Sequence, residues 1–264
     1  MDEYTIERIN NMYKDSLGDR MKQYESIPQN YLMRRTPVII RLDGCHFHSF
    51  TKGLKKPFDP IMQKSMQDTM KYLCENIMGC VLGYTQSDEI TLVLCDYKKL
   101  DTQAWFDSRV SKVVSVSSSL ATLAFNKAFN KYCISEIFDN AERYGNLLRK
   151  KIEQGAYFDS RAFNLQIDEV CNCLIWRQQD AERNSIQSLA QSLFSHKELC
   201  GISCKELQNK MFTEKDVNWN DLPTTLKRGS CCIYTENGWM IDNEIPIFTQ
   251  DRDYVERRIV FNED

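Results

Sequence analysis

The order of the apolar segments is the feature that most constrains the fold of this 264-residue chain. The elements it predicts in turn are a strand at Val38 to Leu42, a helix at residues 59–79, two strands at Val81 to Thr85 and Ile90 to Leu94, a helix at Trp105 to Phe129 and a strand at Arg161 to Gln166. Strand, helix, hairpin, helix, strand is the βαββαβ order of a ferredoxin-like antiparallel sheet with helices on one face. The sequence therefore predicts an α+β fold.

The remainder of the chain predicts helices and a second hairpin. A long helix is expected from Asp168 to Phe194, a short one opens at the capping box "SCKE" at Ser203, and a hairpin turns at Glu236 to Gly238. No repeat or flexible linker divides the sequence, so residues 1–264 are expected to form a single compact unit. Residues from about 30 to 170 would form its core, and residues 171–264 a helical and hairpin extension.

Two aspartates mark a candidate metal site. Asp43 and Gly44 follow the first strand directly, and Asp88 lies at the polar tip "QSDE" of the hairpin. The predicted topology makes these segments neighbours, and two adjacent carboxylates can clamp two Mg²⁺ ions about 3.5–4 Å apart for nucleotidyl transfer. Gly44 would let the backbone approach a metal or phosphate. The alternative is that each aspartate is an ordinary turn residue.

Charge alone does not identify a partner. The formal net charge of -3 gives no overall attraction to nucleic acid. Local basic clusters could form a phosphate-binding track, although each could equally be a solvated face: Lys52, Lys55 and Lys56; Arg109 and Lys112; Arg149, Lys150 and Lys151; Lys227 and Arg228.

The cysteines and the hydropathy point to the cytoplasm. The eleven cysteines are scattered and odd in number, and spacings such as those of Cys171 and Cys173 favour buried reduced thiols over a zinc site. No apolar run is long enough to cross a membrane. The first ten residues, "MDEYTIERIN", are acidic, unlike a basic leader.

An ordered set of motifs carries a family resemblance. The segments "RLDGCHFHSF", "KKPFD", "YTQSDEITLVL", "WFDSRVSK", "FDSR" and "KRG" occur in the order found in the tRNA-His guanylyltransferase superfamily. The resemblance covers roughly residues 15–235. It implies a polymerase-like palm for the predicted core, and addition of nucleotides to tRNA 5′ ends in the 3′-to-5′ direction.

The resemblance also implies roles for individual residues. Asp43, the Gly44 carbonyl and Asp88 would bind two Mg²⁺ ions, and Glu89 would be an essential acid beside them. The nucleotide and its triphosphate would be bound by His48, Lys56, Ser87, Arg109 and Lys112. RNA would be bound by Arg161, Lys227 and Arg228. Guanidinium and ammonium groups suit phosphate oxygens.

One segment departs from the enzymes that add an extra guanosine to tRNA-His. After W-R-Q-x-D, those enzymes carry His-Ile-Asn-Asn-Leu-Tyr-Asn, whereas the span from Glu182 to Ser188 retains only Asn184. This pattern resembles the Thg1-like branch, which implies template-dependent repair of 5′-truncated tRNA, with ATP, GTP or other NTPs as substrates and a homotetrameric assembly. The alternatives are guanosine addition to tRNA-His, a nucleotide cyclase without the G-G-D-E-F signature, and a non-catalytic RNA-binding protein.

Overall fold

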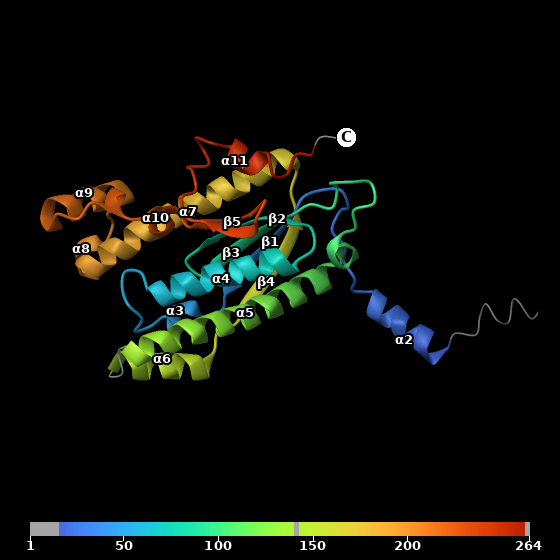
Figure 1. The fold of residues 1–264 in the computed structure, drawn as a ribbon, viewed down its shortest axis with the longest axis horizontal. Helices are drawn as coiled ribbons and strands as arrows, with labels where there is room; N and C mark the ends of the chain where they lie inside the picture. Colours follow the sequence, from blue (N-terminus) through green and yellow to red (C-terminus); the bar gives the residue numbers. More distant parts are fainter. Residues whose placement is uncertain (1–15, 140–142, 262–264) are drawn as a thin grey trace, which may run out of the picture.

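A six-stranded antiparallel sheet forms the centre of the computed structural model, which describes residues 16–139 and 143–261. The strands are β1 (Val38–Gly44), β2 (Cys80–Gln86), β3 (Glu89–Leu94), β4 (Phe158–Asn164), β5 (Ser230–Thr235) and β6 (Gly238–Asp242). They lie in the order β4-β1-β3-β2-β5-β6 (Figure 1). The first four strands have the neighbours of a ferredoxin-like sheet, which confirms the predicted α+β fold.

Both predicted hairpins are present, and the second extends the sheet built by the first. β2 and β3 pair around the tip at Ser87 and Asp88. β5 pairs with β2, with Tyr84 opposite Cys231, and β6 pairs with β5. The C-terminal hairpin therefore continues the sheet that carries the candidate site.

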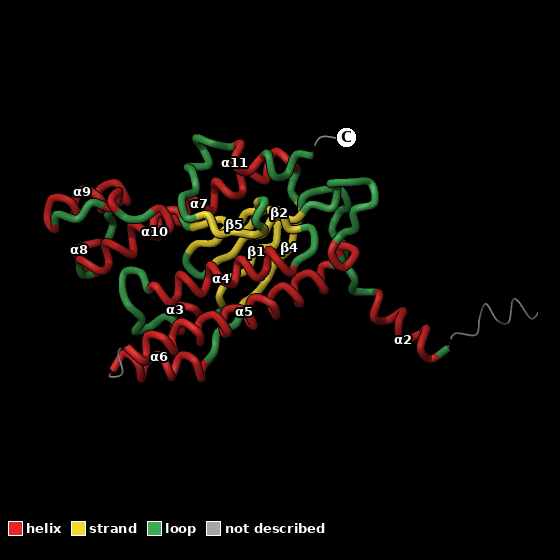
Figure 2. The backbone as a smooth tube through the Cα atoms, in the orientation of Figure 1, coloured by secondary structure: helices red, strands yellow, loops and turns green. Residues whose placement is uncertain are grey.

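Helices cover both faces of the sheet (Figures 1 and 2). α4 (Pro60–Asn76) and α5 (Val110–Asp139) pack against one face, where Ile40 and Leu42 of β1 are buried, as the palm-like prediction requires. α7 (Ile167–Leu193) and α11 (Asp253–Glu256) pack against the other face, over Ile39 of β1. Burial on both faces explains the continuous apolar run at the start of β1, because a strand with one face in solvent would alternate apolar and polar residues.

The remaining helices are shorter or lie outside these layers. They are α2 (Leu17–Ser26), α3 (Phe47–Phe50), α6 (Arg143–Gln154), α8 (His196–Leu199), α9 (Cys204–Lys215), α10 (Thr224–Arg228) and the 3-10 turns η1 (Trp105–Ser108) and η2 (Trp219–Asp221). The C-terminal half of α7 projects beyond the sheet and forms a small separate core with α9 and η2 around Ile186, Met211 and Trp219. Ser203 caps α9 in the predicted capping box.

Several predicted boundaries are wrong by three residues or more. The helix expected to end at Phe129 continues to Asp139 in α5. The helix expected from Trp105 begins only at Val110, because Phe106 and Asp107 adopt left-handed backbone with φ of 50° and 52°. The strand expected from Arg161 begins at Phe158. This earlier start brings Asp159 into the sheet beside the candidate site.

α2 lies apart from the rest of the described chain. None of its residues is buried, and it projects away from the body at the end opposite α9 (Figures 1 and 2). Its apolar side chains Leu17, Met21 and Tyr24 are all exposed and follow one helical face. Across the described ranges, no helix combines the length and hydropathy needed to cross a membrane.

Candidate active site

Strand register gathers the predicted carboxylates at one end of the sheet. β1 pairs with β3 so that Asp43 lies opposite Glu89, and the Gly44 N–H donates to the Asp88 carbonyl at 3.1 Å. On the other side of β1, Asp43 lies opposite Asp159 of β4. The structure therefore brings Asp43, Gly44, Asp88 and Glu89 together, as the topology predicted.

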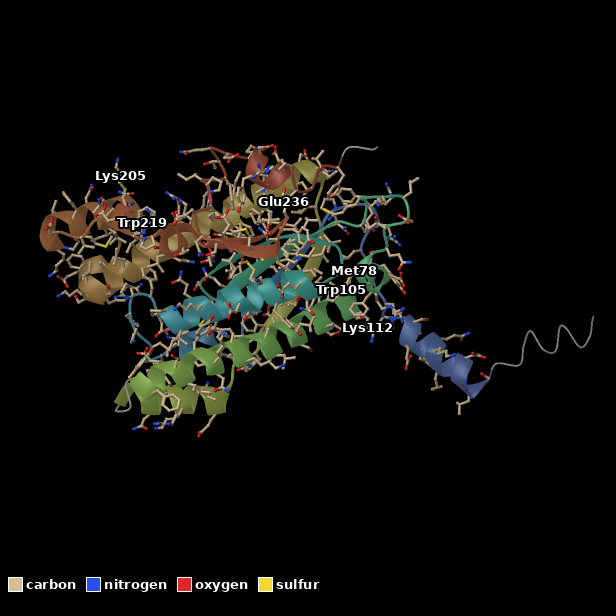
Figure 3. All side chains as sticks on the ribbon, in the orientation of Figure 1. Met78, Trp105, Lys112, Lys205, Trp219 and Glu236 are labelled. Atoms are coloured by element: carbon tan, nitrogen blue, oxygen red, sulfur yellow. The ribbon has the colours of Figure 1, made fainter. Side chains whose placement is uncertain are left out.

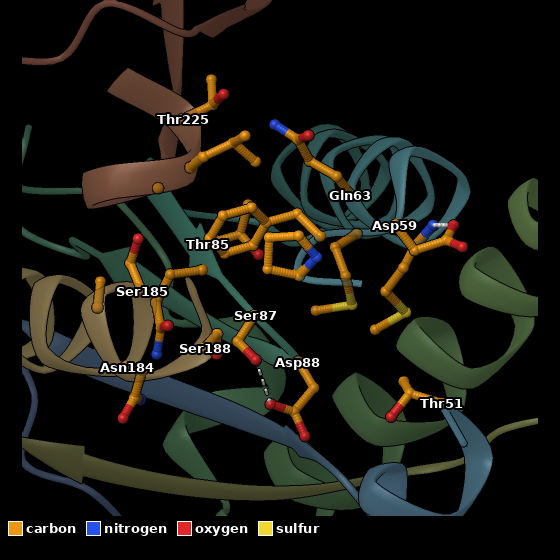
Figure 4. Close-up of a pocket in the computed structure, with 18 of the residues that line it drawn as sticks. Thr51, Asp59, Gln63, Thr85, Ser87, Asp88, Asn184, Ser185, Ser188 and Thr225 are labelled. Carbon is orange, nitrogen blue, oxygen red and sulfur yellow. Dashed lines mark hydrogen bonds between the residues drawn. The ribbon is translucent and has the colours of Figure 1, made fainter. Parts of the chain in front are cut away.

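Asp88 occupies the tight turn between β2 and β3. Ser87 adopts left-handed backbone with φ of 51°, which reverses the chain within two residues. The Ser87 hydroxyl donates to Asp88 Oδ1 at 3.0 Å (Figure 4). The hydroxyl thus orients the carboxylate at the tip of the hairpin.

Burial raises the pKa of all three predicted carboxylates. For Asp43, the negative charge of Asp159 adds to the effect of burial, while Arg161 and Arg41 oppose it. Burial also raises the pKa of Asp88, with a further contribution from Asp43. Several partly buried carboxylates without enough positive charge between them are typical of a site that binds cations.

Glu89 has a different environment from the two aspartates. It belongs to β3 rather than to the turn, and Arg177 Nη1 of α7 donates to both of its carboxylate oxygens at 3.2 and 2.9 Å. Burial raises the pKa of Glu89, and the guanidinium of Arg177 partly offsets this. The buried ion pair ties the middle of α7 to the site end of the sheet.

The donor set of the two aspartates fits Mg²⁺. Carboxylate and carbonyl oxygens are the ligands that Mg²⁺ prefers, and it usually keeps several waters and phosphate oxygens as well. Within residues 16–139 and 143–261, no three His, Cys, Asp or Glu side chains gather into a complete metal cage. Asp43, Asp88 and the Gly44 carbonyl could therefore hold metal together with a bound phosphate, and not as a closed structural site.

Packing explains why glycine follows Asp43. A Cβ added to Gly44 would lie 2.2 Å from Cδ2 of the Phe47 ring. The Phe47 ring is buried among Phe50, Phe125 and Phe158. The structure thus gives Gly44 a packing reason in addition to the close approach of metal or phosphate that the sequence predicted.

A pocket of ≈ 450 Å³ opens beside Asp88. It lies among the loop before α4, the hairpin tip, the C-terminal half of α7, and α10, and its size is that of a small-molecule site. Five of the predicted residues line it: His48, Lys56, Ser87, Asp88 and Lys227. Figure 4 shows Ser87, Asp88, Asn184, Ser188, Gln63 and Thr225 around this space.

Buried contacts fix the segment that carries His48 and Lys56. Phe47 and Phe50 anchor α3 in the core, and Lys151 Nζ donates to the Ser49 carbonyl at 3.1 Å. Asp59, which is buried, caps α4 and also accepts the Lys55 N–H at 2.9 Å. These contacts hold His48 and Lys56 at the rim of the pocket without using their own polar groups.

Arg109 and Lys112 lie at the opposite end of the sheet. The backbone of Arg109 pairs with Tyr31, and Lys112 lies near Trp105 and Met78, where β1 begins (Figure 3). It is Thr122, ten residues further along α5, that contacts Phe158 next to Gly44, and ten helical residues span about 15 Å. Within one chain, these two residues do not reach the pocket.

The three residues predicted to contact RNA have different surroundings. Arg161 is exposed and lies 3.4 Å from Asp159. Lys227 Nζ donates to the Asn220 carbonyl at 2.6 Å, and Arg228 pairs with Glu182 at 3.1 Å. Lys227 and Arg228 therefore brace α10 against its neighbours, whereas Arg161 faces solvent.

Several site residues were not predicted. Asp159 and Arg161 alternate with the smaller or apolar Phe158, Ser160 and Ala162 in "FDSRAF", a period-two charge pattern that could have revealed Asp159. Arg177 pairs with Glu89, which is 88 residues away in the sequence, and no local sequence pattern predicts such a contact. Asn184, Ser185 and Ser188 line the pocket because α7 continues past the sheet.

Replacement of Asp88 by asparagine should stabilise the metal-free protein at pH 7. Burial raises the pKa of Asp88 in the folded state above its value in the unfolded chain. The folded protein therefore loses stability as the pH rises through this pKa and the carboxyl group ionises. We expect a higher Tm for Asp88→Asn in EDTA at pH 7 and a shrinking difference toward pH 4. Mg²⁺ should raise the Tm of the wild type more than that of the variant.

The exposed Asp101→Asn serves as the matched control and should leave the Tm unchanged. A lower Tm of Asp88→Asn in EDTA at pH 7 would contradict this account of the carboxylates.

Comparison with known proteins agrees with the geometry. The family model described as tRNAHis guanylyltransferase matches residues 18–166, more than half of the chain. An uncharacterized protein of Acanthamoeba polyphaga mimivirus is 31% identical over 241 residues, which cover 85% of this chain and 79% of that protein. The tRNA(His) guanylyltransferase of Saccharomyces cerevisiae is 26% identical over 230 residues, 80% of this chain and 86% of that enzyme.

Solved structures resemble this chain in both fold and sequence. A bacterial tRNA(His) guanylyltransferase (Thg1)-like protein in complex with ATP has a TM-score of 0.82 and 46% identity, covering 93% of this chain and 100% of that chain. The bacterial Thg1-like protein in complex with GTP has a TM-score of 0.74 and 40% identity over the same shares. This chain belongs to the tRNA-His guanylyltransferase family, whose members are tRNA nucleotidyltransferases.

Proposed function

We propose that this protein is a Mg²⁺-dependent 3′-to-5′ nucleotidyltransferase that repairs 5′-truncated tRNA by templated addition of NTPs. The observation that carries the proposal is that Asp88 lines a pocket of nucleotide size and that Asp43 lies next to Asp88 at the same end of the sheet. Similar bacterial proteins have been solved in complex with ATP and with GTP, which supports NTPs as the occupants of this pocket.

In this reaction, the 3′-hydroxyl of the bound NTP attacks an activated 5′-phosphate of the RNA. A new phosphodiester forms, the hydroxyl loses its proton, and pyrophosphate or AMP leaves, depending on whether the RNA carries a triphosphate or was first adenylylated by ATP. Lys56 and His48, at the pocket rim, would bind and orient the triphosphate oxygens. When bound by Asp43 and Asp88, Mg²⁺ would neutralise phosphate charge and increase the acidity of the attacking hydroxyl.

The wall of the pocket favours repair over addition of guanosine to full-length tRNA-His. Ser185 and Ser188 line the pocket and stand where the motif of the guanosine-adding enzymes is lost, whereas the neighbouring Asn184 is the one motif residue retained. Addition of guanosine opposite an adenosine needs protein groups that enforce the choice, because Watson–Crick pairing opposes it. Repair needs only pairing with the opposing acceptor strand. The names of the curated relatives support the alternative, guanosine addition.

A comparison of two substrates separates these functions. We expect kcat/KM to be higher for a tRNA lacking its first 5′ nucleotide than for full-length tRNA-His, with incorporation of whichever NTP pairs with the template base. Changing the template base should change the incorporated nucleotide accordingly. A clear preference for full-length tRNA-His, with guanosine added regardless of the opposing base, would support guanosine addition and overturn the repair assignment.

We further propose a homotetramer in which one copy supplies Arg109 and Lys112 to the pocket of another. The exposed apolar face of α2, formed by Leu17, Met21 and Tyr24, supports self-association. The distance of Lys112 from its own pocket supports a contribution in trans.

The eleven cysteines form no disulfide in the described ranges, which supports a reducing, cytoplasmic location.

Subunit mixing tests the contribution in trans. Lys112→Ala should lower kcat/KM for NTP by roughly 10–150-fold, the effect of losing a charge-assisted hydrogen bond of about 1.5–3 kcal/mol. Asp88→Ala should be inactive, yet it retains Lys112. Co-refolded mixtures of the two variants should regain activity that neither has alone. Full activity of Lys112→Ala by itself, or no recovery in a mixture shown to co-assemble, would contradict the proposal.

A further inference from the structure

An exposed indole lies on the side of the carboxylates away from the nucleotide pocket. Trp176, on α7, is 48% exposed, although the neighbouring Leu174 and Arg177 are buried against the sheet. Its ring lies beside Arg41 of β1, while the pocket is lined by residues of β2, β5 and α10 among others. In the strand order β4-β1-β3-β2-β5-β6, β3 separates β1, which carries Arg41 and Asp43, from β2, which lines the pocket next to Asp88.

Two guanidinium groups lie over the ring of this indole. Arg177 Cζ lies 3.5 Å from the centroid of the Trp176 ring, and Arg41 Cζ lies 5.6 Å from it. Arg41 is directly opposite Arg161 in the pairing of β1 with β4. Residues two apart on a strand share a face, so Arg41 and Asp43 lie on the α7 side of the sheet. We call the set of Trp176, Arg41 and Arg161 the Trp176 platform.

The platform has unused capacity for an anion. The Nε atom of Arg41 is buried and has no hydrogen-bond partner in the described chain. A buried donor without a partner is unfavourable, and a phosphate oxygen would satisfy it. Arg161 is half exposed, and within the described ranges its ion pair with Asp159 is a loose one at 3.4 Å. Phosphate oxygens could therefore engage both guanidinium groups.

The platform is open to a large ligand. β4 is the edge strand of the sheet, and no described strand pairs with its outer side. Arg161 and Asp159 on this strand have side chains that are 51% and 50% exposed. The pocket, by contrast, is bounded by α4, α7 and α10. A polynucleotide can thus reach the carboxylates from the β4 edge while a mononucleotide occupies the pocket.

We propose that Trp176 stacks on the base of the 5′-terminal nucleotide of the acceptor RNA and that Arg41 and Arg161 bind its phosphate. This inference rests on the proposed nucleotidyl transfer, because it identifies the position of the second reactant. A single ring among guanidinium groups is suited to a nucleotide, since stacking is sequence-tolerant and the charges match phosphate. A docking surface for a protein would need a contiguous apolar patch.

Substitutions of Trp176 test the stacking. Trp176→Ala should lower kcat/KM for 5′-truncated tRNA by about 5–150-fold, equivalent to about 1–3 kcal/mol at 1.4 kcal/mol per tenfold, with the KM for NTP unchanged. Trp176→Phe should retain most of the activity because it keeps a stacking ring. Phe138→Ala, which removes an exposed aromatic ring at the far end of α5, is the matched control and should have no effect.

A binding measurement gives a readout that is independent of activity. Among the four tryptophans, only Trp176 should respond when 5′-phosphorylated RNA quenches the intrinsic fluorescence, so Trp176→Phe should abolish the quenching. Free NTP should produce no such signal. Arg161→Gln should reduce the slope of log K against log salt for RNA by about 1.

Three outcomes would overturn the platform. They are an unchanged KM for tRNA in a Trp176→Ala protein with wild-type Tm, quenching that persists in Trp176→Phe, and loss of NTP affinity in place of RNA affinity. Failure of the wild type to add nucleotides to any tRNA, with RNA quenching intact, would instead count against the proposed reaction while supporting the RNA site.

Discussion

The register of β1 against β3 is the constraint on which the whole site depends. It sets Asp43 opposite Glu89 and lets the Gly44 N–H bond the Asp88 carbonyl, so carboxylates 45 positions apart meet at one sheet end. A slip of one residue would turn Asp43 to the α4 face and Leu42 to the α7 face. The apolar residues prevent that slip, since Ile39 and Ile40 must each enter a different core. The hydrophobic effect thus aligns the acidic site.

The aligned carboxylates make the empty site costly and the bound site favourable. Burial raises the pKa of Asp43 and of Asp88. Arg161 and Arg41 offset the shift at Asp43 only in part, and Arg177 is bonded to Glu89. Divalent metal and phosphate would supply the missing positive and bridging groups. The two sides of the site then have separate tasks: the pocket beside Asp88 suits a mononucleotide, and the open β4 edge suits a strand of RNA. The unpaired carboxylates that the reaction requires thus lower the folding stability of the metal-free protein.

Much of this arrangement could be predicted from the sequence because it depends on local patterns. The polar tip between two apolar runs specified the β2–β3 hairpin, and Asp59 with Pro60 specified the start of α4. Patterns of this kind fail where tertiary contacts decide. The left-handed Phe106 and Asp107 delay α5, and α7 covers the second sheet face with Arg177 aimed at Glu89. The sequence also does not show that Lys112 and Asp88 lie at opposite ends of the sheet of one chain, because that depends on how α5 packs.

Nucleotide transfer by a variant lacking Asp43 tests the central claim most directly, because that claim assigns the reaction to the paired carboxylates. The measurement is transfer of label from NTP to 5′-phosphorylated truncated tRNA at several Mg²⁺ concentrations, for the wild type and for Asp43→Ala with a Tm confirming that it folds. The account predicts a loss of at least about 10³-fold in nucleotide addition. Near-normal addition by Asp43→Ala at low Mg²⁺ would contradict it.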